Sequence, residues 1–215
     1  MTRLVLARHG QACCNVDRTI EGLATCRGLS DLGRRQAAAL AKRLASESFE
    51  PDVVVSSPIL RARQTSEIVC EALGRAATFE SAFEEIRPGD AEGMSWDQYT
   101  AFFGNSEGWD PNVPFAPNAE SWAGFAGRVS RALDQVTESH EGQTVLVVTH
   151  GGVVDASLFH YFALDPTVQS PIDFETTNTS LTEWQRRRFT LPNDDEIHRW
   201  RLGRYNDAAH LNGVE

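Results

Sequence analysis

The chain has 215 residues, a length that suits one domain, residues 1–215, with a substantial hydrophobic core. Its net charge of −10 argues against nucleic acid as the main partner. No apolar stretch approaches the roughly 18 residues of a membrane span, and Met1-Thr2-Arg3 leads into the first predicted strand without the apolar segment of a signal peptide, so we expect a cytoplasmic protein.

The first predicted elements alternate between strand and helix. Leu4-Val5-Leu6-Ala7 has the length and composition of a buried strand, and residues 31–46 carry apolar side chains at helical spacing. Residues 53–55 predict a second buried strand. Ser57-Pro58 then opens a helix, with serine as the N-cap and proline at the first helical position. A third strand is expected around residues 78–79.

The second half of the chain continues in the same order after an insertion. Residues 86–118 are irregular and rich in glycine, proline and aromatic residues, and we interpret them as a lid. The elements expected after the lid are a helix at about 121–139, a strand at 145–149, a helix at about 153–162, and a hairpin of strands 180–184 and 197–202 around the polar Asn193-Asp194-Asp195.

This alternation predicts an α/β fold. We expect a three-layer sandwich, in which a mostly parallel central sheet has helices on both faces and carries the lid insertion. The parallel strands would all end at one edge of the sheet, where ligands bind in this architecture.

Polar residues gather at this edge. Arg8-His9-Gly10 follows the first strand, and Arg61 lies in the first turn of the helix after the second strand. Glu84-Glu85 follows the third strand, and His150-Gly151 follows the strand at 145–149. Because a helix N-terminus near Arg61 also favours anions, the sequence predicts an anion site that contains a nucleophile.

Five motifs in order carry a resemblance to a known family. They are Arg8-His9-Gly10-Gln11 with Asn15, Leu29-Ser30-Asp31-Leu32-Gly33 with Gln36-Ala37, residues 56–65 around Arg61, Phe83-Glu84-Glu85-Ile86 with Gly89 and Glu92-Gly93, and Thr149-His150-Gly151-Gly152. Together they resemble the histidine phosphatase superfamily, also called the phosphoglycerate mutase-like family. The resemblance covers nearly the whole chain, and five ordered motifs are far more specific than the first alone.

The resemblance implies a role for each motif residue. His9 would be the nucleophile, because a neutral imidazole can accept a phosphoryl group near neutral pH and so divide hydrolysis into two displacements. Glu85 would be the acid–base residue, with Glu84 as the alternative in register and Glu92 as a structural residue. The groups that would hold the phosphate are Arg8, Arg61 and His150 as catalytic donors, and Asn15, Gln11 and Gly151 as substrate-binding residues.

No metal or cofactor is implied. Two arginines and a histidine supply the positive charge that Mg²⁺ supplies in other phosphoryl-transfer enzymes, and the histidines and cysteines lack ligand spacing. The expected partner is a small phosphomonoester, with neither nucleic acid nor membrane. The sequence leaves the oligomeric state open, and a homodimer is compatible with it.

The resemblance includes both phosphatases and mutases. From Pro88 to Gly127 the chain has no Lys or Arg but many aromatic residues, whereas a mutase must hold a second anionic group of its substrate. We therefore favour a metal-independent phosphomonoesterase that hydrolyses a small organic phosphate, such as a sugar phosphate, through a phosphohistidine. The alternatives are a phosphoglycerate mutase-type transfer and a non-catalytic module that binds a phosphorylated ligand.

The four cysteines show no regular framework and are expected to be free thiols. Cys13 and Cys14 lie between His9 and Asn15, in the loop expected to surround the phosphate. If either sulfur faces the pocket, the nearby Arg8 and Arg61 would favour a reactive thiolate. The alternative is that both are small buried residues that fill space.

Overall fold

The computed structural model describes residues 1–104, 109–190, 192 and 195–214. Within these residues the strands form one six-stranded sheet in the order β3-β2-β4-β1-β5-β6. The strands are β1 (Thr2–Arg8), β2 (Val53–Ser56), β3 (Ala77–Phe79), β4 (Thr144–Thr149), β5 (Leu181–Thr190) and β6 (Glu196–Asp207). β1 to β4 pair in parallel, and β5 and β6 add an antiparallel edge, so the predicted mostly parallel sheet is confirmed.

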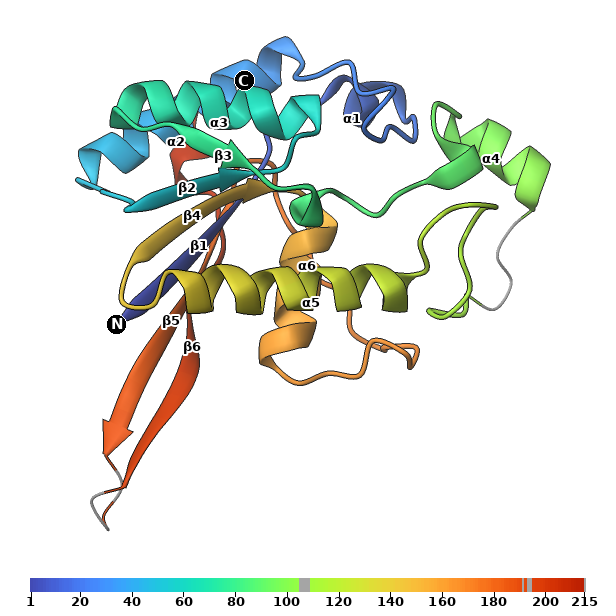
Figure 1. The fold of residues 1–215 in the computed structure, drawn as a ribbon. Helices are drawn as coiled ribbons and strands as arrows, with labels where there is room; N and C mark the ends of the chain where they lie inside the picture. Colours follow the sequence, from blue (N-terminus) through green and yellow to red (C-terminus); the bar gives the residue numbers. More distant parts are fainter. Residues whose placement is uncertain (105–108, 191, 193–194, 215) are drawn as a thin grey trace.

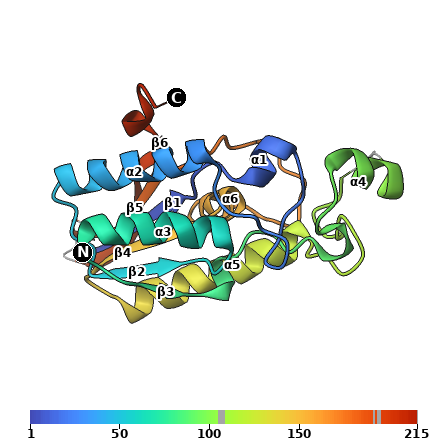
Figure 2. The ribbon, with the colours of Figure 1, turned by 90° about the horizontal axis from the view of Figure 1, so that it is seen from above.

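Helices cover both faces of this sheet. They are α1 (Cys13–Asp17), α2 (Asp31–Ser46), α3 (Leu60–Leu73), α4 (Trp96–Phe103), α5 (Trp122–Ser139) and α6 (Gly151–Tyr161). α2 and α3 lie on one face, and α5 and α6 lie on the other (Figures 1 and 2). The predicted three-layer α/β sandwich is therefore confirmed. Among the described residues, no helix has the length and apolar character needed to cross a bilayer.

Alternating side chains of β1 build the two halves of the core. Leu4 and Leu6 pack in the apolar cluster that includes residues of α5 and α6, and Val5 and Ala7 pack in the cluster that includes residues of α2 and α3. A strand buried on both faces reads as a continuous apolar run, which explains the sequence of β1. This double burial fixes the position of the strand end that carries Arg8 and His9.

Three helices differ from the sequence prediction. α3 begins at Leu60 with Ile59 as its N-cap, because Ile59 still has extended backbone angles. Ser57 is therefore not the N-cap, and its hydroxyl instead accepts a hydrogen bond from the Ile59 amide over 3.3 Å. α6 begins at Gly151, two residues earlier than expected. The short α1 was not predicted, because its five residues carry no helical apolar pattern.

The lid contains more regular structure than expected. Within residues 86–118, α4 begins at a capping box in which Ser95 and Gln98 bond each other's backbone amides. The prediction of an irregular segment was therefore wrong for residues 96–103, where a Ser-x-x-Gln signal was present in the sequence. α4 lies beyond the carboxyl ends of the parallel strands (Figure 1).

Hydrogen bonds tie the lid to the loop that follows α1. The Ile20 amide donates to the carbonyl of Met94 over 2.8 Å, and the Trp96 amide donates to the carbonyl of Arg18 over 3.2 Å. Glu92 accepts hydrogen bonds from the amides of Ala24 and Thr25. These contacts anchor residues 92–96 to the loop after α1 and agree with a structural role for Glu92.

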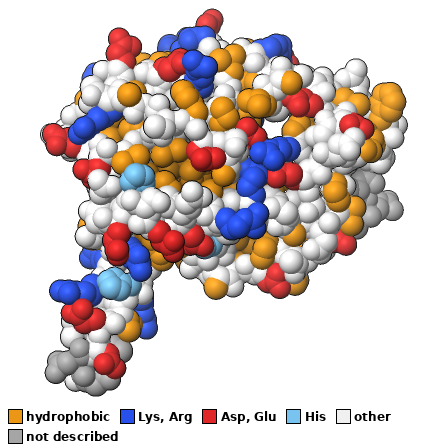
Figure 3. Space-filling view, viewed as in Figure 1, with side chains coloured by type: hydrophobic (Ala, Val, Ile, Leu, Met, Phe, Trp, Pro, Cys, Tyr) orange, Lys and Arg blue, Asp and Glu red, His pale blue; other side chains and the backbone are white. Residues whose placement is uncertain are grey.

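The predicted hairpin is present, and its strands are longer than the sequence indicated. β5 and β6 pair from Leu181 with Asp207 to Thr190 with Glu196, with register shifts near Glu183. The hairpin projects from the body of the molecule as an arm that bears both acidic and basic side chains (Figure 3). Asn193 and Asp194 of the predicted turn lie outside the described residues.

Candidate active site

Two histidines meet at the carboxyl ends of neighbouring strands. His9 follows β1 and His150 follows β4, and the two strands pair in parallel up to Arg8 and Thr149. The imidazole centroids are 5.2 Å apart with the rings at 63° to each other. Both side chains are buried, His9 at 3% and His150 at 0% exposure. The parallel register thus brings together residues 141 positions apart in the chain.

Hydrogen bonds define the tautomer of His9. Its Nδ1 lies 2.7 Å from the carbonyl oxygen of Gly10, a contact that requires Nδ1–H as the donor. The Nε–H of Arg61 donates to Nε2 over 3.1 Å, so Nε2 carries the lone pair. Burial, reinforced by the charges of Arg61 and Arg8, lowers the pKa of His9 well below its usual range. His9 is therefore neutral, with an unprotonated Nε2 that faces Arg61.

Close backbone packing holds the loop that carries His9. A Cβ at Gly10 would overlap the backbone of Gly33 in the first turn of α2, so only glycine allows this approach. The Gly10 amide donates to Thr65 Oγ1 over 3.1 Å, and Ser30 caps α2 by accepting from the Gly33 amide over 3.0 Å. The loop is therefore fixed between α2 and α3 at the strand end.

The predicted phosphate ligand Arg61 is 4% exposed and projects from the first turn of α3. Besides its bond to His9, it donates from Nη1 to the carbonyl of Glu21 over 3.1 Å. Arg8 donates from Nη1 to the carbonyl of Thr176, while its buried Nε has no hydrogen-bond partner among the described residues. An unpaired guanidinium donor at this depth is suited to an anionic oxygen.

His150 presents a second unpaired donor. The Ser57 hydroxyl lies 2.8 Å from His150 Nε2, and a bond donated by this hydroxyl occupies the lone pair of that nitrogen. The remaining proton of the neutral ring then lies on Nδ1, which is buried and unpartnered within the described residues. Burial, together with the charge of Arg61, lowers the pKa of His150 well below its usual range. His150 is therefore a neutral N–H donor.

The two neighbouring glutamates occupy different environments. Glu85 Oε2 accepts from the Gly152 amide at the start of α6 over 3.1 Å, and Oε1 accepts from the Ile86 amide over 3.0 Å. Glu84 pairs with Arg87 over 3.0 Å and is 5% exposed, so its charge is buried and already paired. Only Glu85 of the two lines the pocket.

A pocket of about 480 Å³ adjoins His9 through Arg61, which lines the pocket and bonds the imidazole. Arg61 and Glu85 lie in its lining, and the aromatic residues that line it are Trp96, Tyr99, Trp109, Phe115 and Trp122. Two carboxylates of the wall are already neutralised, since Glu21 pairs with Arg27 over 2.7 Å and Glu120 pairs with Arg128 over 2.6 Å. Arg61 is the one arginine or lysine among the described lining residues.

The three predicted substrate-binding residues differ in position. Gly151 begins α6 beside Arg8, and a Cβ there would lie 3.6 Å from the Arg8 Nε. Gln11 Oε1 instead accepts from the Ser30 hydroxyl over 2.7 Å. Asn15 is exposed and its Oδ1 accepts from the Ala12 amide over 2.9 Å. The side chains of Gln11 and Asn15 thus stabilise the loop after β1 and α1, and neither lines the described pocket.

The thiol chemistry differs from the expectation. Cys14 lines the pocket, but burial raises its pKa to about 11 and outweighs the opposing charge of Arg61. The prediction that an arginine would favour a thiolate was therefore wrong for Cys14, because desolvation penalises the charged form more strongly. All four cysteines are free. The described residues hold no group of three or more acidic, histidine or cysteine side chains placed for a metal ion.

Sequence reasoning did not single out four residues that support this site. Ser57 and Thr65 lie within the motif of residues 56–65 but were given no role in the site, although they contact His150 and the Gly10 amide. Thr176 and Asp155 form a hydrogen-bonded pair, 3.1 Å apart, beside Arg8. No local pattern around Thr176 indicates that its carbonyl meets an arginine 168 residues earlier.

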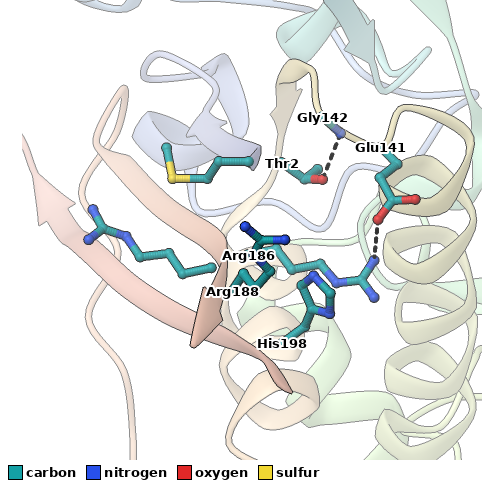
Figure 4. Close-up of a pocket in the computed structure, with 8 residues that line it drawn as sticks. Thr2, Glu141, Gly142, Arg186, Arg188 and His198 are labelled. Atoms are coloured by element: carbon teal, nitrogen blue, oxygen red, sulfur yellow. Dashed lines mark hydrogen bonds and ion pairs between the residues drawn. The ribbon is translucent and has the colours of Figure 1, made fainter. Parts of the chain in front are cut away.

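A second large cavity, of about 490 Å³, lies at the opposite end of β1 (Figure 4). The charge of its arginines is partly neutralised, because Arg186 pairs with Glu141 over 3.5 Å. On the same wall, the Thr2 hydroxyl accepts a hydrogen bond from the Gly142 amide over 2.9 Å. It contains none of the motif residues. The cavity lined by Arg61 and Glu85 is therefore the candidate active site.

Comparison with known proteins agrees with this geometry. The model of the histidine phosphatase superfamily (branch 1) matches residues 4–194. The metal-independent phosphoserine phosphatase of Arabidopsis thaliana is 33% identical over 223 residues, which cover 100% of this chain and 85% of that protein. The uncharacterized phosphatase PhoE of Bacillus subtilis is 29% identical over 213 residues, covering 99% and 98%.

Solved structures show the same likeness along the whole chain. YhfR of Bacillus stearothermophilus superposes with a TM-score of 0.80 at 28% identity and covers 100% of both chains. A mycobacterial glucosyl-3-phosphoglycerate phosphatase superposes with a TM-score of 0.72 at 27% identity, covering 95% of this chain and 98% of that one. With the match of the family model and the paired histidines at the strand ends, the chain belongs to the histidine phosphatase superfamily.

Proposed function

We propose that this phosphatase hydrolyses small organic phosphomonoesters through a phosphohistidine formed on Nε2 of His9. The observation that carries the proposal is the hydrogen bonding of His9, which leaves Nε2 unprotonated and directed at Arg61. A nucleophile with a lone pair and an adjacent fixed cation is the arrangement that phosphoryl transfer requires.

In the first displacement, His9 Nε2 forms a bond to phosphorus while the bond to the ester oxygen breaks. Glu85, when it carries a proton, gives that proton to the departing oxygen, so an alcohol leaves. Arg61 then bonds the phosphoryl oxygens in place of the Nε2 lone pair. The Nε–H of Arg8 and the Nδ1–H of His150 supply further donors, which stabilise the charge spread over the equatorial oxygens.

In the second displacement, water attacks phosphorus and the bond to His9 Nε2 breaks. Glu85, now ionised, accepts a proton from the attacking water, and inorganic phosphate leaves. The two backbone amides that bond Glu85 hold its carboxylate on the pocket side of α6. One carboxyl group therefore serves both displacements and returns to its starting protonation state.

The walls of the pocket favour hydrolysis over mutase chemistry. A mutase needs cations for the second anionic group of its substrate, and the described lining offers Arg61 alone. Aromatic rings instead suit an apolar, ring-containing or cationic leaving group. The relatives include phosphatases named for phosphoserine and for glucosyl-3-phosphoglycerate, which supports a phosphatase without defining the substrate of this chain.

A rapid quench in alkaline detergent with a radiolabelled phosphomonoester tests the intermediate directly. We expect acid-labile label on the protein, and its absence under turnover would contradict the proposal.

In parallel, phosphate release and the interconversion of 3- and 2-phosphoglycerate are measured in the same samples, with and without EDTA. Release without interconversion, unaffected by chelation, is the expected result. Loss of activity on chelation that Mg²⁺ or Zn²⁺ restores would contradict the metal-independent mechanism.

A further inference from the structure

A smaller cavity, of about 270 Å³, adjoins the active-site pocket. The two cavities share Trp109 and Trp122 as lining residues. The smaller one continues along α6, away from the histidines, to Asp155 and Phe159. The mechanism above uses none of the side chains that line this smaller cavity alone, so its shape and charge require a separate explanation.

Aromatic rings with large interplanar angles line one side of this cavity. Trp122 and Phe159 have their centroids 5.3 Å apart with an interplanar angle of 71°, and Phe159 and Phe174 are 6.2 Å apart at 82°. Because of this edge-to-face packing, the three rings that line the cavity have different orientations. Groups of rings arranged in this way bind quaternary ammonium ions through their negative faces.

A half-buried carboxylate, Asp155, lines the same cavity as these rings. Asp155 accepts one hydrogen bond, from the Thr176 hydroxyl to Oδ1 over 3.1 Å, and no salt bridge to it occurs among the described residues. Burial and the charge of Glu85 raise its pKa to about 7. The second carboxylate, Asp173, is exposed and accepts from the Phe174 amide over 2.9 Å. The described lining of this cavity contains no Lys or Arg.

The position of Asp155 relates this cavity to the phosphate site. Gly151 lies beside Arg8, and Asp155 follows it by one turn of α6, about 5–6 Å along the helix axis. A ligand with its phosphate at Arg8 and a positive group at Asp155 therefore needs only a short chain between the two.

We propose that the cavity lined by Asp155, Trp122, Phe159 and Phe174 binds the ammonium group of the substrate, so that the enzyme acts on phosphomonoesters of amino alcohols and prefers quaternary ones. This inference rests on the proposed phosphatase function. Asp155 supplies the counter-charge, and the rings supply contacts to the N-methyl groups that water cannot replace. The preference excludes leaving groups that bear a carboxylate, which would lie against Asp155.

The test compares phosphocholine with its uncharged carbon isostere, 3,3-dimethylbutyl phosphate. The two esters differ only in the charged nitrogen, so the ratio of their kcat/KM values isolates recognition of charge. We expect a ratio of about ten or more in favour of phosphocholine. In Asp155→Asn, which keeps the shape and the bond from Thr176, the ratio should fall to about one. Asp134→Asn, which removes a carboxylate that pairs with His160 outside the cavity, is the matched control and should keep the wild-type ratio.

Each other outcome overturns the inference. A wild-type ratio near one, or a faster reaction with a sugar phosphate than with phosphocholine, would show that the cavity does not select a cation. An equal loss with both esters in Asp155→Asn would show that Asp155 only positions Arg8 through Thr176. Hydrolysis of p-nitrophenyl phosphate is measured alongside, because its persistence would leave the proposed phosphatase function intact.

If no ester is hydrolysed, the proposed function fails, and binding still tests the cavity by itself. Calorimetric titration with choline and with 3,3-dimethylbutanol then reports recognition without turnover. Weaker binding of choline than of the neutral alcohol would overturn the inference, and tighter binding that Asp155→Asn abolishes would support it.

Discussion

The Nε–H of Arg61 donates to Nε2 of His9 over 3.1 Å, which places a fixed positive charge on the atom that would attack phosphorus. The contact gives Arg61 two functions. Before phosphate binds, the arginine helps to keep His9 neutral, because its charge opposes protonation of the imidazole. Once phosphate binds, the same guanidinium is beside the oxygens that gain charge. A cation that only bound phosphate would not need to contact the nucleophile.

Arg61→Gln should therefore change the pH dependence of the reaction as well as its rate. Without the charge of Arg61, the pKa of His9 rises toward its usual value, so a larger fraction is protonated at a given pH. The acid limb of kcat/KM should move to higher pH, and kcat/KM at its optimum should fall by about 100-fold or more. Arg63→Gln, on an exposed arginine of α3 that pairs with Glu67, should change neither. An unshifted acid limb in Arg61→Gln would contradict the first function.

His9→Ala should abolish turnover and the labelled phosphoenzyme while leaving a cooperative unfolding transition. The substitution removes Nε2, and the loop remains held by the amide of Gly10 on Thr65 and by the packing against Gly33. Phosphatase activity and acid-labile label are measured on the same preparation, with thermal unfolding as the check on folding. Activity within tenfold of the wild type would show that His9 is not the nucleophile.

Glu85→Gln should affect esters according to their leaving groups. An alkyl alcohol needs a proton as it departs, whereas an aryl leaving group such as p-nitrophenol departs without one. We expect a loss of at least about 100-fold in kcat for alkyl phosphates and a smaller loss for p-nitrophenyl phosphate. Glu84→Gln, which removes the buried pair with Arg87, tests the alternative register and should lower stability without this selectivity. Equal losses on both kinds of ester for Glu85→Gln would reject the assignment.

The parts of the site that follow a strand were predictable from the sequence, because their positions depend on sheet topology. The buried runs at β1 and β4 determine where His9 and His150 lie, and parallel pairing then brings them together. The contacts of Thr176 and Asp155 depend instead on the path of the loop that connects α6 to β5. No local sequence pattern predicts that path. α4 was missed because glycine and proline around it outweighed the capping signal at Ser95.

The protonation states of the site residues were harder to predict than their positions in the fold. The proximity of Arg61 to Cys14 was expected to favour a thiolate, but the sequence does not show the depth of burial, which decides the balance. The same holds for Glu84, whose burial with Arg87 is a property of the packed structure. Residue types at strand ends identify the chemistry of a site, whereas the protonation states require the solvent exposure of each group.

Alkylation of Cys14 should consequently be slow at neutral pH. Because the thiolate is the reactive form and the pKa is about 11, the rate of inactivation by iodoacetamide should rise about tenfold per pH unit between pH 7 and 9. Inorganic phosphate should protect, and Cys14→Ser should resist inactivation, because Cys14 lines the pocket. Cys70→Ser, a buried cysteine of α3, is the control. Inactivation of Cys14→Ser at the wild-type rate would assign the effect to another thiol.

Asp155→Asn should raise the free energy of unfolding at pH 8. Burial and Glu85 raise the pKa of Asp155 from 3.8 to about 7, so the folded state holds this proton more tightly than the unfolded state does. The stability linked to the protonated form is complete below pH 3.8 and is lost as the pH rises through 7.

The amide avoids this loss because it has no charge to bury and still accepts from Thr176. We expect a gain of about 1–2 kcal/mol at pH 8 that vanishes toward pH 4, measured by urea unfolding of both proteins across this range. The comparison at pH 4 is the internal control, since the carboxyl group is then largely protonated in the folded protein. A variant that is less stable than the wild type at pH 8 would show that the Asp155 carboxylate stabilises the fold. A gain would show instead that this buried charge is retained at a cost in stability, as expected of a residue that binds a ligand.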